Sequence, residues 1–464
     1  MSSQKISKMS YTPNPDMPVS TISGDIEKHW RPSDTTSEAA TSSSSTISTS
    51  TSESSDDEIS LPSITRKKGL SFIMTLLNFL KGMIGPGCLS LPVAFKQSGL
   101  WCGFSLVFIF GFLNNYCMLQ LVHCSQYLSR KKGDAHLDYG NVAYEACENS
   151  FKWLRPYKHI VRIIVNTTII ALQVGICSVF YVFVGVHTRI GYCSAVGNVL
   201  MIISLGFIFQ YLIRAEHVMS ELPWISDFNG ILTACGSILY SFEGQAMVLP
   251  MENKLKNPKN MIGPFGVLST GMSLVSVVYA ACGFFGYITY GNNVEGSITL
   301  NLPNSVQFNI VKIFLTLVVS FGFMIQQYVI VEMTWPTLHK NVLTKKIPKA
   351  PKLPFELFYR AFLVITAMSI AIAIPNLEQI IPLVGVSCGM MLAFVFPALI
   401  DTITFLPPLL RKHARCESEH EKRKAKISIY YRILQNSVLV IVGCFGCIAG
   451  LQSTIRDLIQ SNTH

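Results

Sequence analysis

Long apolar runs recur along this chain from residue 70 to residue 453, and no other feature constrains its fold as strongly. A helix needs about 20 apolar residues to cross the hydrocarbon core of a bilayer. Only 14% of the residues are charged, well below the roughly 25% of soluble domains. We therefore predict an all-α polytopic membrane protein with spans at 70–98, 100–128, 161–188, 193–213, 228–250, 261–289, 307–337, 357–375, 379–407 and 429–453.

The first 66 residues differ sharply from the rest. Residues 41–55 read TSSSSTISTSTSESS, and a segment with so little apolar surface cannot offset the entropy cost of ordering. We predict a disordered Ser/Thr-rich tail over 1–66 and one transmembrane domain over 67–464. No soluble domain intervenes, and the longest loop contains DYGNVAYEACE (138–148), which predicts a short surface helix.

Positive charge gathers in alternate loops, while loop 290–306 contains no Lys or Arg. Cytoplasmic loops of membrane proteins carry the excess of Lys and Arg, so the net charge of +10 indicates topology and not nucleic-acid binding. The tail and the basic loops are predicted to be cytoplasmic; these loops are 129–159, 251–260, 338–356 and 408–428.

This topology raises a parity problem. Loops 129–159 and 251–260 are both predicted on the cytoplasmic side, which requires an even number of crossings between them. Three spans lie there instead. Either one of the three does not cross, or a helix is missing from this chain.

The first span is interrupted by KGMIGPGCLSLP (81–92), with Gly82, Gly85, Pro86 and Gly87 inside six residues. Non-helical backbone at bilayer depth is tolerated only where it is buried or lines a cavity. The ends of the two half-helices then offer N–H groups to a carboxylate and carbonyl oxygens to a cation. The pattern predicts a site for a small zwitterion; a packing or kink motif is the alternative.

The span over 228–250 carries a second interruption, SFEG, with Glu243 near its centre. A carboxylate at that depth is costly and indicates function, although an ion pair with a base such as Lys81 is an equally reasonable structural explanation. Interrupted helices in both halves of a chain are typical of transporters built from inverted repeats.

Other polar residues within the spans are weaker candidates for ligand contacts, because for each of them the pattern favours an interhelical hydrogen bond over a contact with a ligand. They are Gln173, Tyr181, Gln326 and Tyr328. The cysteines are scattered, and the pair Cys444 and Cys447 is interpreted as helix packing, so neither a metal site nor a cofactor is expected.

Three stretches together, LLNFLKGMIGPGCLSLP, SFEGQAMVLPMEN and GSITLNLP, resemble the amino acid/auxin permease family, and most closely its proton-coupled amino acid transporter branch. The resemblance runs from about residue 67 to residue 455. It implies an eleven-helix core with the inverted five-plus-five repeat of the LeuT-like fold. It also implies symport of small neutral amino acids with protons, and a substrate site at Gly82, Ile84, Gly85, Gly87, Ser241, Phe242, Glu243 and Gly244.

The sequence departs from this family at two places. Asn78 stands where the branch usually has a titratable His, so Glu243 becomes the candidate proton carrier if burial brings its titration close to neutral pH, and sodium stays an alternative coupling ion. The family's fourth helix has no counterpart between about His187 and Ile190, which is where the parity problem lies.

Two other functions stay open. One is an amino-acid sensor without useful flux, with which the long Ser/Thr tail is compatible, and the other is a transport-deficient isoform that lacks one helix. The plasma membrane and a vacuolar or lysosomal membrane are both compatible with the sequence, and membrane lipid is the only other expected partner.

Overall fold

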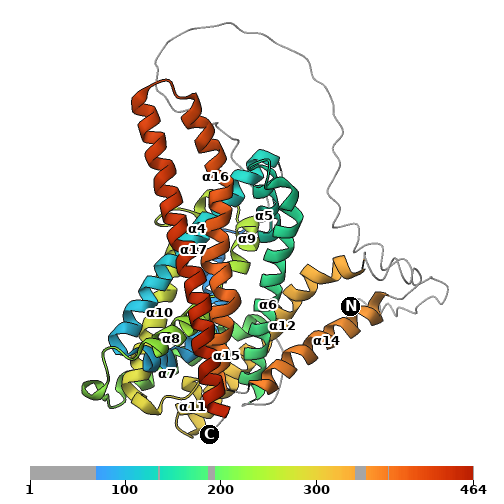
Figure 1. Ribbon diagram of the computed structural model, residues 1–464. Helices are drawn as coiled ribbons and strands as arrows, with labels where there is room; N and C mark the ends of the chain where they lie inside the picture. Colours follow the sequence, from blue (N-terminus) through green and yellow to red (C-terminus); the bar gives the residue numbers. More distant parts are fainter. Residues whose placement is uncertain (1–68, 134–135, 186–193, 340–351, 375, 463–464) are drawn as a thin grey trace, which may run out of the picture. The chain divides into compact units, whose positions relative to one another are not determined.

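A computed structural model describes residues 69–133, 136–185, 194–339, 352–374 and 376–462, all of which fall within one compact unit, Ser60–His464 (Figure 1). The predicted tail and the junction at residues 187–190 lie outside the described residues. Where the chain is described it is helical, apart from turns, loops and one isolated β-bridge between Leu70 and Leu255.

Each of the ten predicted spans contains helix. The long elements are α2 (Phe72–Met83), α3 (Pro86–Ser98), α4 (Leu100–Lys132), α6 (Lys158–Gly185), α7 (Ser194–Arg214), α8 (Phe228–Ser241), α9 (Gln245–Lys254), α10 (Val267–Tyr290), α12 (Val306–Leu338), α14 (Lys352–Ala373), α15 (Leu377–Val384), α16 (Phe396–Arg415) and α17 (Glu419–Asn462). Shorter elements are α5 (Tyr139–Glu148), α11 (Ile298–Asn301), η1 (Arg155–Tyr157), η2 (Met219–Glu221), η3 (Pro258–Met261), η4 (Gly291–Asn293), and two π-helical turns between α15 and α16, η6 (Gly385–Gly389) and η7 (Met391–Val395).

Within the described residues, seven helices are long and apolar enough to cross a membrane, and the bent pair α2–α3 raises the number to eight. The apolar helix at α7 covers only Leu200–Arg214 and is shorter than these seven. The α8 and α9 segments have 14 and 10 residues, each less than one crossing requires. The ten spans and the eleven-helix core therefore stay predictions.

Local sequence explains where several helices begin and end. The Ser71 hydroxyl accepts a hydrogen bond from the backbone N–H of Met74, and the Asp227 carboxylate accepts one from Gly230. Both side chains thus satisfy N–H groups that a helix start leaves free. Helix α4 ends at Gly133, whose φ of 76° is a left-handed conformation that glycine adopts without strain.

The predicted surface helix at 138–148 is present as α5, but it is not a surface helix. Helix α5 packs against α6, α4 and α16. Seven of its ten residues are buried: Tyr139, Gly140, Val142, Ala143, Glu145, Ala146 and Cys147. The sequence shows the polar positions of this loop, whereas its burial depends on helices that are distant in sequence.

The two interrupted segments run antiparallel. Helix α2 packs on α9, and α3 packs on α8. The start of the first segment is also joined to the end of the second, because the N–H of Leu70 donates to the carbonyl of Lys254 at 2.8 Å and the N–H of Lys256 donates to the carbonyl of Leu70 at 3.0 Å. These backbone bonds fix the depth of one segment relative to the other.

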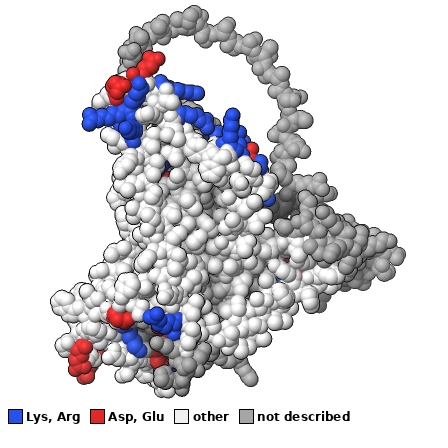
Figure 2. Space-filling view, in the orientation of Figure 1, with Lys and Arg blue, Asp and Glu red and all other residues white. Residues whose placement is uncertain are grey.

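Charged side chains are distributed unevenly over this part of the molecule. Figure 2 shows Lys and Arg gathered at the end where α16 connects to α17, with a broad band that displays no charge next to it. The connection belongs to the basic loop 408–428. Such a band is the surface expected to face lipid.

Helix α8 is held against the π-helical turn η6 by a very close backbone approach. A Cβ atom at Gly385 would lie 1.9 Å from the carbonyl oxygen of Gly236. Real Cβ atoms do not approach backbone oxygens so closely, so only glycine at position 385 permits this packing.

We expect Gly385→Ala to separate α8 from η6 and to destabilise the fold by about 1–3 kcal/mol, the usual cost of overpacking. Thermal unfolding of the purified full-length chain in detergent measures this as a lower Tm. Gly206→Ala is the control, because a Cβ at that helical position meets nothing within 4 Å. Equal melting temperatures for the two variants would contradict the assignment.

Candidate functional site

The first break lies between α2 and α3, whose axes differ by 53°. Helix α2 ends at Met83, Ile84 and Gly85 are extended, and Pro86 begins α3. Proline suits the first helical position because it lacks the N–H that would be unpaired there. Gly85 has an extended backbone conformation that any residue can adopt. A Cβ atom at this position would meet nothing within 4 Å. The space beside Gly85 is therefore free.

The second break covers Phe242, Glu243 and Gly244, between α8 and α9. A side chain of α4 holds it in place. The amide Nδ2 of Asn114 donates to the Phe242 carbonyl at 2.8 Å, and Gln245 Nε2 donates to Asn114 Oδ1 at 2.6 Å. Both amide side chains are buried, with exposures of 1% or less. The chain itself thus satisfies a carbonyl released by the break, as a lipid environment requires.

The two breaks touch each other. A Cβ on Gly87 would lie 2.8 Å from the Cα of Ser241, and a Cβ on Gly244 would lie 2.3 Å from the Met83 sulfur. Gly82 faces the flexible side chain of Met247 in the same way, at 2.5 Å. The contact between the interrupted helices, predicted from sequence, is confirmed, and the glycines permit it by close packing.

Tyr279 of α10 links both half-helix ends. Its hydroxyl oxygen lies 2.6 Å from the carbonyl oxygen of Met83 and 2.7 Å from that of Ser241. These are the last residues of α2 and α8. A phenol carries one proton, so Tyr279 donates to one carbonyl at a time. Its ring also packs against Phe242, with centroids 4.9 Å apart.

Glu243 lies in the second break with one carboxylate oxygen, Oε1, buried and without a hydrogen-bond partner among the described residues. The ion pair with Lys81, which the sequence offered as an alternative explanation, is not formed: Lys81 is exposed, and no ion pair among the described residues includes Lys81 or Glu243. The Tyr240 hydroxyl and Gln245 Oε1, which flank this break in sequence, are also buried and unpaired. Such atoms are costly to leave unsatisfied, which favours a polar ligand or water here.

The structure does not gather all the predicted residues at the breaks. Gln173 is buried on α6 with its Oε1 unpaired, and Tyr181 is half-buried on the same helix. Gln326 and Tyr328 lie on α12, which packs on α6, α7 and α14, and Tyr328 is 53% exposed. Asn78 is exposed on α2. The sequence predicted how deep each of these residues lies in its span, but not which face of the helix carries it.

Sequence reasoning missed Tyr279, Asn114 and Gln245. Asn114 had a usable signal, because two asparagines, 114 and 115, stand together in an apolar run. Tyr279 had none, since a tyrosine in such a run is ordinary. Within the described residues, no group of three or more His, Cys, Asp or Glu side chains could hold a metal ion.

This arrangement of two broken, touching helices is that of a membrane carrier, and comparison with known proteins defines the class. A family model described as transmembrane amino acid transporter protein matches residues 68–190 and 187–420. The chain therefore belongs to this transporter family, in agreement with the resemblance to amino acid/auxin permeases. The members of this family are transporters and not enzymes.

Two relatives illustrate the similarity. "Probable amino acid transporter skat-1" of Caenorhabditis elegans is 34% identical over 424 residues, which cover 83% of this chain and 90% of the relative. "Proton-coupled amino acid transporter-like protein pathetic" of Drosophila melanogaster is 28% identical over 430 residues, covering 83% of this chain and 85% of the relative.

The two family matches meet at residues 187–190. This is the place where the sequence predicts that a family helix is missing. Residues 186–193 lie outside the described part of the chain, so the missing helix stays a prediction.

We expect Gly85→Leu to reduce amino acid uptake to background while leaving membrane insertion and Tm close to wild type. A Cβ at this position meets nothing within 4 Å, so the new side chain would start in the free space beside the break and fill part of it. Uptake of radiolabelled alanine, normalised to the amount of protein in the membrane, measures the effect. Gly85→Ala is the control and should retain more uptake; full uptake by Gly85→Leu would remove this space from the site.

A second substitution tests the link between the half-helices. Tyr279→Phe keeps the ring packing on Phe242 but removes the one hydroxyl proton that the carbonyls of Met83 and Ser241 share. We expect a loss of about 1–3 kcal/mol of stability, the cost of unsatisfied buried polar groups, together with a large loss of uptake. Thermal unfolding and uptake on the same preparation measure both effects. Unchanged uptake would mean that the hydroxyl is dispensable.

Proposed function

We propose that this protein is a secondary active transporter that moves small neutral amino acids with protons by alternating access. The observation that carries the proposal is the contact between the two broken helices, with main-chain groups at both breaks, free space beside Gly85 and a Glu243 carboxylate oxygen that has no partner among the described residues. The antiparallel pairing of α2 with α9 and of α3 with α8 supports an inverted-repeat, LeuT-like core.

The proposed binding mode follows from the ends of the half-helices. The N-termini of α3 and α9 begin at the two breaks, and the N–H groups and positive dipole ends there suit the substrate carboxylate. Glu243 and the carbonyl ends suit its ammonium group. The proposed substrate-binding residues at the breaks are Gly82, Ile84, Gly85, Gly87, Ser241, Phe242, Glu243 and Gly244.

Proton coupling is favoured over sodium coupling by Tyr279. In inverted-repeat carriers, half-helix carbonyl ends coordinate the sodium ion. Here the carbonyls of Met83 and Ser241 both face the Tyr279 hydroxyl, at distances of an ordinary O–H···O hydrogen bond. Glu243 is the proposed proton carrier, because a charge at bilayer depth is costly and protonation removes it. Asn78 cannot titrate and is exposed.

The orientation and membrane location belong to the same proposal. We propose that the end rich in Lys and Arg faces the cytoplasm. The basic residues Arg66, Lys67 and Lys68 ahead of the first span predict the same side for the N-terminus. The plasma membrane and a vacuolar or lysosomal membrane both satisfy this orientation. A second function, a chain that binds amino acids without transporting them, is favoured by the division of the family match into two parts that meet at residues 187–190.

Uptake and current measured against a panel of amino acids, with pH and sodium varied independently, test the proposal. We expect uptake to rise as the external side is acidified, because the proton is a co-substrate, and to be independent of sodium. Glu243→Gln, which carries no titratable proton, should flatten the pH dependence.

Glu332→Gln is the matched control, because Glu332 is an exposed carboxylate on α12 and should leave the pH profile intact. A pH profile unchanged by Glu243→Gln would remove Glu243 from the proton path. Saturable amino acid binding without flux would instead support the non-transporting alternative.

A further inference from the structure

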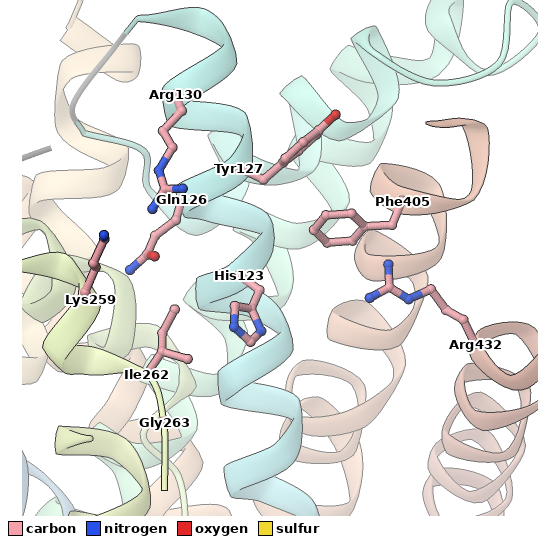
Figure 3. A pocket seen from close by; sticks show the side chains of 9 residues that line it. All are labelled: His123, Gln126, Tyr127, Arg130, Lys259, Ile262, Gly263, Phe405 and Arg432. Atoms are coloured by element: carbon pink, nitrogen blue, oxygen red, sulfur yellow. The ribbon is translucent and has the colours of Figure 1, made fainter. Parts of the chain in front are cut away.

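A pocket of about 530 Å³ lies apart from the broken helices (Figure 3). Four residues of α4 line it, with three from segment 259–263, one from α16 and one from α17. None of them belongs to α2, α3, α8 or α9, so the pocket is separate from the proposed substrate site.

The pocket is strongly basic. Figure 3 shows Arg130 and Lys259 on one side of α4 and Arg432 on the other, with the His123 imidazole between them. Arg432 is partly neutralised, since its Nε lies 3.4 Å from Asp401 Oδ2 and its guanidinium lies 4.4 Å from the Phe405 ring centroid. Neither Arg130 nor Lys259 forms an ion pair with a described residue, and the Nε of Arg130 is buried without a hydrogen-bond partner.

The acidic groups nearby are already engaged. Asp401 accepts a hydrogen bond from Asn436 at 2.8 Å besides facing Arg432. Glu252 is 2% exposed and accepts a hydrogen bond from Gln126 at 3.3 Å. Neither carboxylate lines the pocket. The positive charge of Arg130 and Lys259 is therefore available to an anion from outside the chain.

The two segments that carry Arg130 and Lys259 are joined to each other beside the pocket. Gln126 Nε2 donates to the carbonyl of Pro258 at 2.9 Å, which ties η3 to α4. Lys259 is the next residue after Pro258, and Arg130 is one helical turn after Gln126. This bond fixes the backbone of Lys259 relative to that of Arg130 before any ligand arrives, so only the two side chains need to be ordered on binding.

The number of free charges indicates the chemistry of the ligand. A phosphate monoester carries about −1.5 to −2 charge near pH 7 and has several strong acceptor oxygens. Two cations, one with an unpaired buried N–H, match that charge. Arginine and lysine are both common phosphate ligands, and hydrogen bonds between ionised groups are stronger than neutral ones.

The surroundings favour a lipid as the source of this phosphate. The pocket includes the apolar side chains Ile262 and Phe405, and Phe265, three residues after Ile262, is 87% exposed. Basic pockets between transmembrane helices on the cytoplasmic side bind anionic headgroups. We propose that this pocket binds the phosphate-monoester headgroup of a membrane lipid, with Arg130 and Lys259 as its principal ligands.

The test uses the full-length chain in neutral detergent and a short-chain fluorescent phosphatidylinositol 4-phosphate as the probe, with binding followed by anisotropy. We expect saturable binding. Each lysine or arginine contributes about 1 kcal/mol toward an anionic lipid, so Lys259→Gln should weaken binding about fivefold and Arg130→Gln/Lys259→Gln about thirtyfold.

A charge-matched control separates this site from diffuse attraction. Arg411→Gln/Lys412→Gln removes two exposed cations at the end of α16 that do not line the pocket, and it should bind the probe like wild type. An equal loss in the control would overturn the proposal, as would an absence of saturable binding. Unlabelled short-chain lipid should displace the probe, whereas displacement at the same concentration by inorganic phosphate or free inositol phosphate would replace the lipid by a soluble ligand.

Lys259→Gln keeps the test decisive if the double variant fails to fold. Lys259 is exposed in η3, and its side chain forms no recorded contact within the described chain. A folded Lys259→Gln protein with wild-type affinity would exclude Lys259 as a ligand.

Discussion

The hydroxyl of Tyr279 and the amide of Asn114 make the rest of this architecture possible. A helix broken at bilayer depth releases main-chain groups that lipid cannot satisfy. Here Asn114 donates to the Phe242 carbonyl, and Tyr279 faces the carbonyls of Met83 and Ser241. The partners come from α4 and α10, which pack against the broken helices, so both breaks are stable only in the assembled bundle.

The same arrangement explains how the ends of the half-helices can be stabilised while other groups at the breaks stay available to a ligand. Tyr279 has one proton for two carbonyls, so its bond to either half-helix end can be exchanged for a bond to the other. In contrast, Glu243 Oε1 and the Tyr240 hydroxyl have no hydrogen-bond partner within the described chain. The space beside Gly85 is not filled by any described group. A carrier needs this combination, because the ligand must supply contacts that the empty protein lacks.

Helix α4 connects the two sites proposed for this chain. Asn114 on α4 holds the second break, and about four turns further along the same helix Gln126 and Arg130 form the basic pocket. Gln126 also contacts Glu252 at the end of α9 and the η3 turn that follows it. A headgroup between Arg130 and Lys259 would thus bind next to the segment that leaves the second broken helix.

The sequence by itself determined the helical membrane-protein class, the positions of the apolar runs, both breaks and the family. Each of these depends on local composition: run length, glycine and proline in a span, and short motifs. Only the tertiary structure decided that α5 is buried, that Tyr279 and Asn114 serve the breaks, and that Tyr328 and Asn78 face outward. The physical reason is that hydrophobic length fixes how deep a residue lies, whereas its partners depend on the helix face that packs against segments far away in sequence. In a span that is apolar on every side, the amino-acid pattern does not mark that face.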